Sequence, residues 1–388
     1  MIPLSYNVRN LAVRKATTVA SAGGIALVVF VLASSLMLSE GLRRTMQSSG
    51  RADTAVVLRK GNNAELSSTI DDPTVGIVRS APGVKAKADG TPMAVGELMV
   101  VAFMETSDGK GRSNVQLRGV PSDAQDFRPE VKVIEGRPLK PGTDEVMVGR
   151  AISGRFKNLR LGDSFELRKN RPVKVVGVFE TGGTAFESEV WADLEVLREA
   201  FGRRGVVSSV RVRLDSPSRF EGFETAIESD KRLGLDAMPE REFYEKQSEG
   251  TTLFITVMGV LIAVFFSVGA MIGAMITMYA AVANRKREVG VLRAIGFSRL
   301  NIVMSFLFES LLIAAVGGAI GSVASLCMGL VSFSMMNFST WSEIVFRFTP
   351  TPQIIGASLA FGGVMGVLGG FFPALRAAAV SPIEAMRE

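Results

Sequence analysis

The sequence predicts an α-helical membrane protein with four transmembrane helices and a large α+β extracytoplasmic domain inserted between the first and second helices. Four uncharged stretches predict the helices, because none contains Asp, Glu, Lys or Arg and each exceeds the roughly 20 apolar residues that cross a bilayer. Between the first two lies a charged segment, broken by Gly, Pro and Asp, whose pattern is typical of short strands. The uncharged stretches are residues 17–38, 253–283, 310–342 and 348–375.

The charges between these stretches set the boundaries of the predicted segments. The first segment is expected to be a helix lying in the membrane interface, since Leu4, Val8 and Leu11 recur at helical spacing. The segments are a cytoplasmic amphipathic N-terminal helix (1–16), transmembrane helix 1 (17–38), the extracytoplasmic domain (39–252), transmembrane helix 2 with a stalk (253–283), a cytoplasmic helix (284–299), transmembrane helix 3 (300–336), a short extracytoplasmic loop (337–352), transmembrane helix 4 (353–375) and a cytoplasmic tail (376–388).

The distribution of positive charge predicts the orientation. Residues 284–301 contain five Lys or Arg and a single Glu, and the segment before the first stretch has three cations and no acid. The connection 337–351 carries one residue of each sign. Because cytoplasmic loops are enriched in Lys and Arg, both termini and the basic loop should face the cytoplasm and the large domain should face out.

The first uncharged stretch has an alternative interpretation as a signal peptide, with Ala33, Ser34 and Ser35 as a small-residue cleavage site. Signal peptides have an apolar region of about 7–15 residues, and this stretch is longer. We therefore favour a retained transmembrane helix.

Composition excludes several kinds of site. The chain has no histidine, which removes Ser-His-Asp and Cys-His catalysis and every histidine metal site. Its single cysteine, Cys327, cannot form an intrachain disulfide. No P-loop occurs, since "SDGKG" at residues 107–111 lacks the required spacing and hydroxyl residue. We expect no catalytic residue, no metal and no cofactor bound by this chain, although Ser with Lys or paired carboxylates could still meet in space.

The extracytoplasmic domain should combine strands with a few helices. Asp72 is expected to cap a helix that has Pro73 in its first turn and stops at Gly83. Residues 207–238 indicate a strand, a helix and a return strand, and "GGTAF" at 182–186 indicates an exposed flexible loop. A binding or force-transmitting surface is the expected use of this domain. Strands are expected at residues 54–59, 84–88, 115–120, 145–148, 164–168 and 173–178.

The transmembrane stretches contain glycines at four-residue spacing, which lets helix backbones approach closely. The pattern suits packing within one chain and a dimer seam equally well. Residues 253–283 would form a helix of about 46 Å, longer than the roughly 30 Å hydrocarbon core, so this helix should tilt or continue outward as a stalk. The glycines are Gly269 with Gly273, Gly317 with Gly321, and Gly362 with Gly366 and Gly370.

Glu309 is an acid within the third predicted transmembrane helix. Such residues usually face the interior of a helix bundle and pair with a polar partner, which the sequence does not identify. The alternative is a position near enough to the interface to be hydrated.

The basic loop predicts a short amphipathic helix. Val289, Leu292 and Ile295 with Gly296 share one face, and the charged residues lie elsewhere around it. Gly296 can end the helix in the left-handed conformation and Ser298 can cap the next one. Physical chemistry alone allows this helix to rest on anionic lipid or to dock into a partner's groove.

Two motifs resemble the permease subunit of MacB/FtsX-type ABC transporters. They are "REVGVLRAIGFSRLNIVMSFLFESLLIAAVGGAIGSVAS" from Arg287 and the C-terminal "FFPALRAAAVSPIEAMRE". Residues 134–167 and 173–180 also resemble the family's periplasmic core domain, whereas Phe297 and Met386 depart from the family pattern. The matching residues are Arg287, Glu288, Gly290, Arg293, Ala294, Gly296, Glu309, Gly317, Gly318, Pro373, Ala374, Pro382, Glu384, Ala385 and Arg387.

The resemblance implies a permease in the bacterial inner membrane that works with a separate ABC ATPase using ATP and Mg²⁺, rather than with an ATPase fused to its N-terminus. It also implies a second permease copy, which is either identical or paralogous. A periplasmic adaptor or outer-membrane protein is a further expected partner, and we expect no binding to nucleic acid. The helix between the second and third transmembrane helices would grip the ATPase, with Val289 and Leu292 as anchors and Glu288 and Arg293 fixing register. The residues assigned to this coupling helix are Arg287, Glu288, Val289, Leu292, Arg293 and Gly296.

Two functions are compatible with this architecture. The first is export or extraction of an amphiphile, such as a drug, lipid or lipoprotein, driven by ATP hydrolysis in the partner. The second is a non-transporting regulator that signals mechanically to an envelope partner such as a cell-wall hydrolase. A membrane enzyme is a distant third, because histidine is missing.

Overall fold

The computed structural model describes residues 15–381, so the expected N-terminal interfacial helix lies almost entirely outside the described residues, as do Pro382, Glu384, Ala385 and Arg387. The chain forms two compact units. The helical unit comprises Met1–Glu40, Leu253–Val331 and Phe348–Glu388, and the sheet unit comprises Gly41–Thr252 and Ser332–Arg347. The chain therefore passes from one unit to the other at four points.

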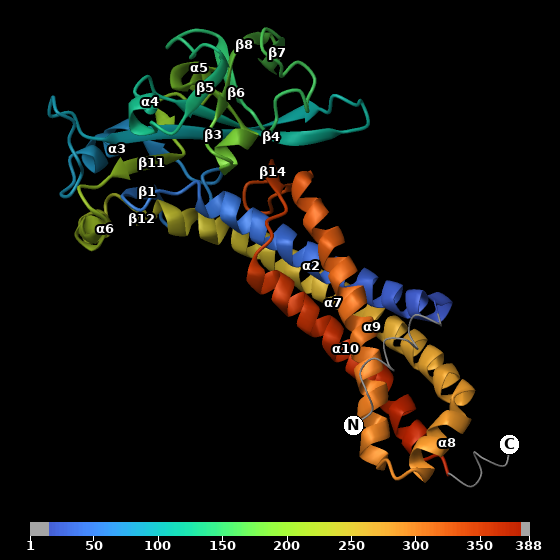
Figure 1. Cartoon of the computed structure of the whole chain (residues 1–388). Helices are drawn as coiled ribbons and strands as arrows, with labels where there is room; N and C mark the ends of the chain where they lie inside the picture. The colour runs from blue at the N-terminus through green and yellow to red at the C-terminus, as the bar shows by residue number, and fades with distance from the viewer. Residues whose placement is uncertain (1–14, 382–388) are drawn as a thin grey trace. The chain divides into compact units, whose positions relative to one another are not determined.

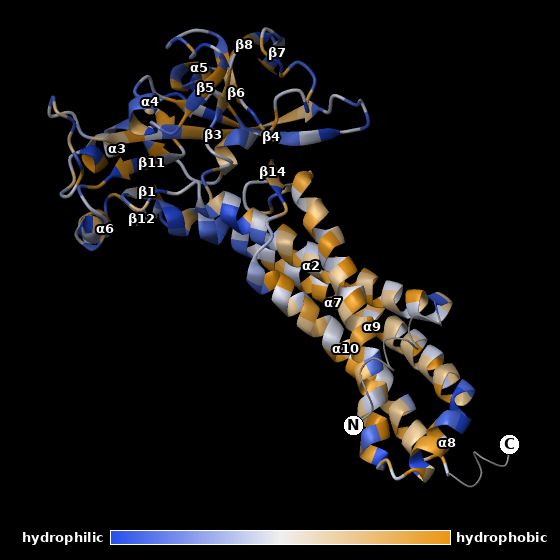
Figure 2. Cartoon of the chain, viewed as in Figure 1, coloured by the Kyte–Doolittle hydropathy of each residue, from blue (hydrophilic) through white to orange (hydrophobic). Residues whose placement is uncertain are grey.

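Within the described residues, four helices are long and apolar enough to cross a membrane (Figures 1 and 2). Most of the sheet unit comes after the first of these helices and before the second along the chain, as the sequence predicts. The four helices are α2 (Lys15–Gln47), α7 (Glu240–Asn284), α9 (Arg299–Cys327, continued by the 3₁₀ turn η3, Met328–Leu330) and α10 (Pro352–Ala378). A shorter helix, α8 (Lys286–Ala294), lies between α7 and α9 along the chain.

Helix α7 is longer than the uncharged stretch that predicts it. It begins at Glu240, well before residue 253, and its 45 residues correspond to about 68 Å. The expected helical extension is therefore present, and its first 13 residues belong to the sheet unit. Both acids of its first turn, Glu240 and Glu242, match the positive end of the helix dipole.

The third transmembrane helix is shorter than expected. We placed its end at residue 336, but the helix stops at Cys327, and Ser332–Met336 form strand β13. Strand β13 pairs with β14 (Glu343–Arg347) in a hairpin that belongs to the sheet unit, so the expected loop 337–352 is largely structured. The absence of charge does not reveal this boundary, because an uncharged stretch is compatible with both a strand and a membrane helix.

The sheet unit is built on a ten-stranded mixed sheet with strand order β12-β1-β11-β3-β4-β9-β6-β8-β5, and β7 pairs with β8. The pairs β4–β9 and β6–β8 are parallel and the other pairs are antiparallel. The strands are β1 (Thr54–Arg59), β3 (Ala94–Glu105), β4 (Arg112–Val120), β5 (Lys132–Gly136), β6 (Glu145–Gly149), β7 (Ser164–Arg168), β8 (Arg171–Glu180), β9 (Glu189–Asp193), β11 (Ser209–Arg213) and β12 (Leu235–Pro239).

Short helices and one further strand pair complete this unit. Strands β2 (Ile70–Asp71) and β10 (Val206–Val207) pair with each other. The expected strand–helix–strand order in 207–238 is confirmed by β11, α6 and β12. The helices are α3 (Asp72–Arg79), α4 (Ala124–Phe127), α5 (Leu194–Ala200) and α6 (Phe220–Ser229), with 3₁₀ turns η1 (Ala185–Ser188) and η2 (Pro217–Arg219).

Most of the predicted strands are confirmed, but two local predictions are wrong. Residues 84–88 form no strand, only the single bridges Val84–Leu214 and Ala86–Pro92, because proline lacks the N–H needed to extend a ladder. Asp72 is the first residue of α3 and Asp71 occupies the cap position, so the expected cap was displaced by one residue.

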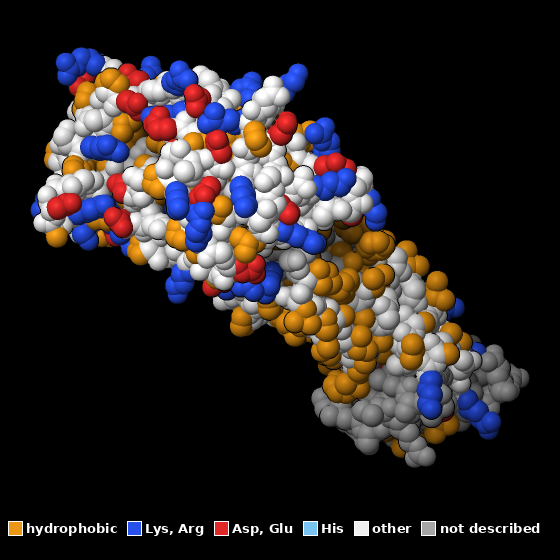
Figure 3. Space-filling view, turned by 90° about the horizontal axis from the view of Figure 1, so that it is seen from above, with side chains coloured by type: hydrophobic (Ala, Val, Ile, Leu, Met, Phe, Trp, Pro, Cys, Tyr) orange, Lys and Arg blue, Asp and Glu red, His pale blue; other side chains and the backbone are white. Residues whose placement is uncertain are grey.

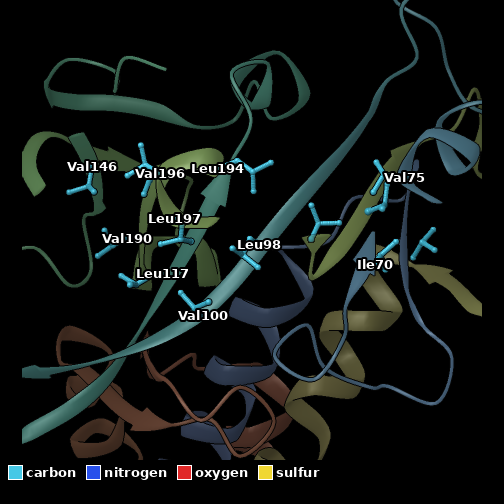
Figure 4. Packing of buried hydrophobic residues seen from close by; sticks show 14 of the residues in the cluster. Ile70, Val75, Leu98, Val100, Leu117, Val146, Val190, Leu194, Val196 and Leu197 are labelled. Atoms are coloured by element: carbon cyan, nitrogen blue, oxygen red, sulfur yellow. The ribbon is translucent and has the colours of Figure 1, made fainter. Parts of the chain in front are cut away.

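One face of the sheet is covered by an apolar core. Leu98, Val100, Leu117 and Val190 lie on adjacent strands, and Leu197 of α5 packs against them (Figure 4). These side chains alternate with residues that point to the opposite face, as the twofold period of a strand requires. On the face seen in Figure 3, the sheet unit carries side chains of both charges, whereas apolar side chains dominate the visible, described part of the helical unit.

Candidate functional site

Helix α8 lies within the segment predicted to be the coupling helix. A buried ion pair attaches it to α9. Arg285, the residue before α8, donates from Nη1 to Oε2 of Glu309 at 2.8 Å, and both side chains are at most 6% exposed. The guanidinium also lies 5.3 Å from the centre of the Phe306 ring, and Glu288 lies 3.5 Å away on the exposed side. Arg285 is therefore the partner of Glu309 that the sequence could not identify.

The other end of α8 is attached to α10. Arg293 donates from Nη1 to the carbonyl oxygens of Ala378 at 2.9 Å and Val380 at 3.1 Å. These carbonyls lie at the C-terminal end of α10, where a cation satisfies unpaired acceptors and matches the negative end of the helix dipole. Arg293 thus makes an intrachain contact.

The face of α8 that we assigned to a partner is buried within the chain. Val289 is 3% exposed and belongs to the apolar core of the helical unit, and Leu292 packs against that core. On the opposite side Val291 is 42% exposed and Ile295 is 72% exposed, and Arg287 lies on the same side one turn earlier. The sequence periodicity correctly placed Val289 and Leu292 on one apolar face, which neighbouring helices of the same chain cover, but it wrongly assigned Ile295 to that face.

The turn after α8 agrees with the sequence. Gly296 has φ +104° and ends the helix, and its Cβ position meets open space. The Ser298 hydroxyl accepts the N–H of Asn301 at 3.3 Å and caps α9.

The glycines of the transmembrane helices divide into two groups. A Cβ added at Gly317 or Gly321 would lie 2.5 Å or 2.4 Å from a carbonyl oxygen of α2, so α9 and α2 pack backbone to backbone there. Gly362, Gly366 and Gly370 of α10 are equally close to α2 or α9 side chains. These five glycines serve packing within the chain.

Gly269 and Gly273 form the second group. Nothing among the described residues lies within 4 Å of a Cβ built at either position, and both glycines are exposed on α7. Val268, Ile272 and Ile276 beside them are 48–64% exposed. Over residues 15–381, this face of α7 takes no part in intrachain packing.

The sheet unit contains a buried ion cluster that sequence reasoning missed. Three arginines and four glutamates are each at most 4% exposed. Arg118 bonds Glu65 at 2.9 Å, Glu97 at 2.8 Å and Glu189 at 2.7 Å. The members are Arg118 (β4), Arg128 (after α4), Arg211 (β11), Glu65 (after β1), Glu97 (β3), Glu189 (β9) and Glu240 (α7).

The remaining bonds join the cluster to the first residue of α7. Arg211 donates to Glu65 and Glu97 at 2.9 Å each and to Glu240 at 2.6 Å. Arg128 pairs with Glu97 and lies 3.6 Å from Glu240. Buried charges persist only when they are paired and hydrogen-bonded, so removing any one member leaves another charge uncompensated.

The cluster sets the protonation of its own acids. Burial alone would raise the pKa of Glu65, but the guanidinium groups of Arg118 and Arg211 outweigh it and hold that pKa at about 2. Burial would likewise raise the pKa of Glu97, but the guanidinium groups of Arg128, Arg211 and Arg118 outweigh it, so this pKa is also lowered. Burial raises the pKa of the neighbouring Tyr244 hydroxyl.

Aromatic rings enclose the cluster. The Phe186 ring centre lies 4.6 Å from the Arg128 guanidinium carbon and 5.9 Å from the ring centre of Trp191. Phe186 is 1% exposed, so the expected exposed loop at 182–186 is wrong at its C-terminal end, where η1 turns the chain inward. Only Gly182 and Gly183 of that motif are exposed.

The sequence did contain a signal for this cluster. Glu97, Arg118, Glu189 and Arg211 each lie within an apolar strand, at alternate positions that point to one face of the sheet. Such alternation usually indicates a face open to water. Here the face is covered, and the charges find partners on neighbouring strands.

A separate cavity of about 300 Å³ lies between α3 and α5, lined in part by Val75, Leu194 and Arg198. Arg198 is engaged by Asp72 and by Glu195, the latter at 2.7 Å, so its charge is satisfied within the wall. Over residues 15–381, no group of three or more Cys, Asp or Glu side chains is placed to hold a metal ion.

Comparison with known proteins identifies both parts of the chain. The profile of the MacB-like periplasmic core domain matches residues 18–230, and that of the FtsX-like permease C-terminal domain matches residues 260–382. The macrolide export ATP-binding/permease protein MacB of Escherichia coli K12 and that of Shigella flexneri are each 28% identical over 319 residues. The match covers 78% of this chain but only 43% of each relative, less than half its length.

Solved structures with similarity to the chain include the extracellular domain of the transporter YknZ, at 18% identity and a TM-score of 0.36, covering 48% of this chain and 99% of that one. The periplasmic region of MacB from Actinobacillus actinomycetemcomitans has 13% identity and a TM-score of 0.38, covering 50% of this chain and 92% of that one.

The buried ion cluster predicts acid sensitivity of the sheet unit. Glu65 has a folded pKa of about 2 against an ordinary value of 4.5, so its stabilising effect is complete above pH 4.5 and is lost as the pH falls toward 2. Tryptophan fluorescence in urea at a series of pH values measures the free energy of unfolding. Glu65→Gln should flatten the pH dependence of the free energy of unfolding, whereas Glu166→Gln, an exposed control in β7, should not. An unchanged slope in Glu65→Gln contradicts this assignment.

The pair Arg285–Glu309 predicts a non-additive pattern of stability. Glu309→Leu leaves Arg285 buried without a counter-charge and should cost about 3–5 kcal/mol, and Glu309→Gln should be milder because it retains a hydrogen-bond acceptor. The double variant Arg285→Met/Glu309→Leu should recover most of the loss. Unfolding in a titration with dodecyl sulfate measures the three free energies. Wild-type stability of both single variants would place Glu309 in a hydrated position.

Proposed function

Because the chain belongs to the MacB/FtsX family of ABC-transporter permeases, we propose that it is the membrane subunit of a transporter whose ATP is hydrolysed by a separate ATPase chain. On this proposal the permease catalyses no reaction and binds no cofactor of its own, and ATP and Mg²⁺ are used by the partner. The main support for this proposal is that α8 is bonded to α9 through Arg285 and to α10 through Arg293. A partner that moves α8 would therefore also move α9 and α10.

The proposed docking surface for the ATPase is the exposed side of α8, in place of the side expected from the sequence. Val291 and Ile295 supply exposed apolar contacts, and Arg287 and Glu288 supply charge at the edge. Interfaces of this kind depend on a few apolar anchors surrounded by polar groups. Val289 and Leu292 support the helix from beneath.

The orientation and the substrate are also part of the proposal. The excess of Lys and Arg in residues 284–301 supports a cytoplasmic position for α8 and both termini, in the inner membrane of a bacterium, with the sheet unit outside. The relatives from Escherichia coli and Shigella flexneri are macrolide exporters by name. We therefore assign to this chain the export or extraction of an amphiphilic substrate, with an envelope protein such as an adaptor as a further partner.

A second permease copy is proposed to cover the face of α7 around Gly269 and Gly273. These glycines have no close neighbour among the residues that the structure describes, whereas the five other glycines at this spacing do. Small residues four apart allow two membrane helices to approach closely. The structure of the single chain thus favours a dimer seam on α7 over one on α9 or α10.

ATPase binding should depend on the exposed apolar side of α8. Val291→Ala/Ile295→Ala should weaken retention of the ATPase subunit on purified permease about thirtyfold, since truncation of an anchor costs about 2 kcal/mol. If α8 instead rests on lipid, Lys286→Gln/Arg287→Gln should weaken vesicle binding by about 1 kcal/mol per charge, and the apolar variant should retain its ATPase. Undiminished retention in the apolar variant rules out this docking surface.

The dimer seam should be sensitive to bulk on α7. Gly269→Leu/Gly273→Leu should lower the dimer fraction, and chain stability should not fall because nothing in the described part of the chain lies within 4 Å of either Cβ. Gly356→Leu on α10 is the control, since that glycine is also exposed and without close neighbours. Light scattering in detergent measures the dimer fraction of both variants. Equal dimer fractions in the two variants would exclude this seam.

A further inference from the structure

The β13–β14 hairpin of the sheet unit presents apolar side chains to the exterior at the turn that joins its two strands. Trp341 in this turn is 58% exposed, and Phe338 is 47% exposed. Residues 332–342 contain no charged side chain. The chain has two tryptophans, and the other, Trp191, is fully buried. Packing inside the sheet unit therefore does not explain why a tryptophan stands in this turn.

The turn holds Trp341 in a conformation that its residue type disfavours. Trp341 has φ +52°, and every other residue with positive φ over residues 15–381 is Gly or Asn. Bulky side chains rarely adopt this region, and Gly or Asn would adopt it at lower cost. The backbone is held by a bond from the Trp341 N–H to the Asn337 carbonyl oxygen at 2.9 Å, and by one from Asn114 Nδ2 to the Trp341 carbonyl oxygen at 2.7 Å. The turn itself does not require tryptophan, which points to a use of the indole ring outside the turn.

Two hydrogen bonds fix the turn at a particular position along α7. The backbone N–H of Phe338 donates to Oγ1 of Thr251 at 3.4 Å, and the Ser339 hydroxyl donates to the carbonyl oxygen of Gln247 at 3.1 Å. Both α7 residues belong to the sheet unit, as the hairpin does, and both are at most 3% exposed. The attachment is therefore a contact within one unit.

At this position α7 changes from polar to apolar. Glu249 is the last charged residue of the helix, and Leu253 begins the apolar stretch assigned to the membrane. At 1.5 Å per residue, Thr251 precedes Leu253 by about 3 Å along the helix axis. Leu253 is 62% exposed and Phe254 is 50% exposed, as expected of side chains that face lipid. The turn is thus attached to α7 at the level where this helix would enter the bilayer.

The chain on either side of the hairpin leads to the same level. Only Val331 lies between the end of η3 and β13, and residues 348–351 connect β14 to α10. Because α9 and α10 are both proposed to cross the membrane, both ends of the hairpin begin at the membrane surface. Tryptophan is enriched at that surface, since its ring is apolar and its N–H is polar. A phospholipid surface therefore fits both the chemistry and the position of the exposed ring.

We propose that the turn Asn337–Ser342 is a lipid-contacting element. In it the Trp341 ring, together with Phe338, inserts at the boundary between headgroups and acyl chains, in the leaflet on the side of the sheet unit. The partner is the phospholipid surface itself, and neither the ATPase nor a second permease copy covers this turn. The inference rests on the proposed function, since it requires that α7, α9 and α10 cross a membrane.

Quenching of tryptophan fluorescence by brominated lipid tests the proposal on the full chain in nanodiscs, without the ATPase. The lipid is phosphatidylcholine, either unbrominated or brominated near the headgroup end of its acyl chain, and bromine quenches only at close range. The wild type should lose about half of its Trp341 emission in the brominated lipid, because the ring lies at the boundary. Trp341→Tyr leaves only the buried Trp191, whose emission is subtracted and should be equal in the two lipids.

A relocated tryptophan is the matched control. Ile77 of α3 lies in the same unit and is 50% exposed, so Trp341→Tyr/Ile77→Trp moves an exposed indole ring away from the hairpin. Its emission should not be quenched. Trp341 emission that is equal in the two lipids, as expected of a turn in water or under a protein partner, overturns the proposal. Quenching of the same size from position 77 also overturns it.

Failure of the proposed function gives a different result. ATPase retention is measured on the same nanodiscs, and its loss with Trp341 still quenched would contradict the ATPase-coupled permease and support the lipid contact. Retained ATPase with unquenched Trp341 would contradict the lipid contact alone. A chain that does not incorporate into nanodiscs would contradict both.

Discussion

Charge that is buried must be paired where it lies, and this constraint organises both units of the chain. In the sheet unit it draws strands β3, β4, β9 and β11 to a common set of arginine–glutamate bonds, with Arg118 and Arg211 each bonding three acids. In the helical unit it fixes Arg285 to Glu309. Because an unpaired partner would be costly, these contacts restrict the geometry more strongly than apolar packing, which tolerates sliding and exchange of similar side chains.

Packing in the helical unit depends on a second constraint, which is that certain positions are glycine and carry no side chain. Gly317 and Gly321 bring α9 against the α2 backbone, where a Cβ would collide with carbonyl oxygens of Ala22 and Ala26. Lipid offers little apolar driving force between helices, so close backbone approach supplies the packing. Helix α7 contributes less to this packing, and nothing in residues 15–381 lies within 4 Å of a Cβ built at Gly269 or Gly273.

Several properties could be predicted from local sequence because local interactions determine them. Four helices follow from uncharged length, Gly296 ends α8 because glycine adopts positive φ without strain, and Ser298 caps α9 with its own hydroxyl. The strand–helix–strand order of 207–238 also follows from local pattern. The motif from Arg287 onward predicted the family, since it combines the charges, glycines and Glu309 in one spacing.

The tertiary structure decided which neighbours each of these residues has. Periodicity showed that Val289 and Leu292 share an apolar face, but the helices packed against α8 determine that this face is buried and that Val291 and Ile295 are exposed. The partner of Glu309 lies 24 residues away, and the acids of the ion cluster pair with arginines up to 146 residues away. Such contacts depend on how distant segments pack, and no local pattern of charge or hydropathy contains that information. Hence the sequence by itself determined the elements and the family, and tertiary packing decided the ion pairs and the free surfaces.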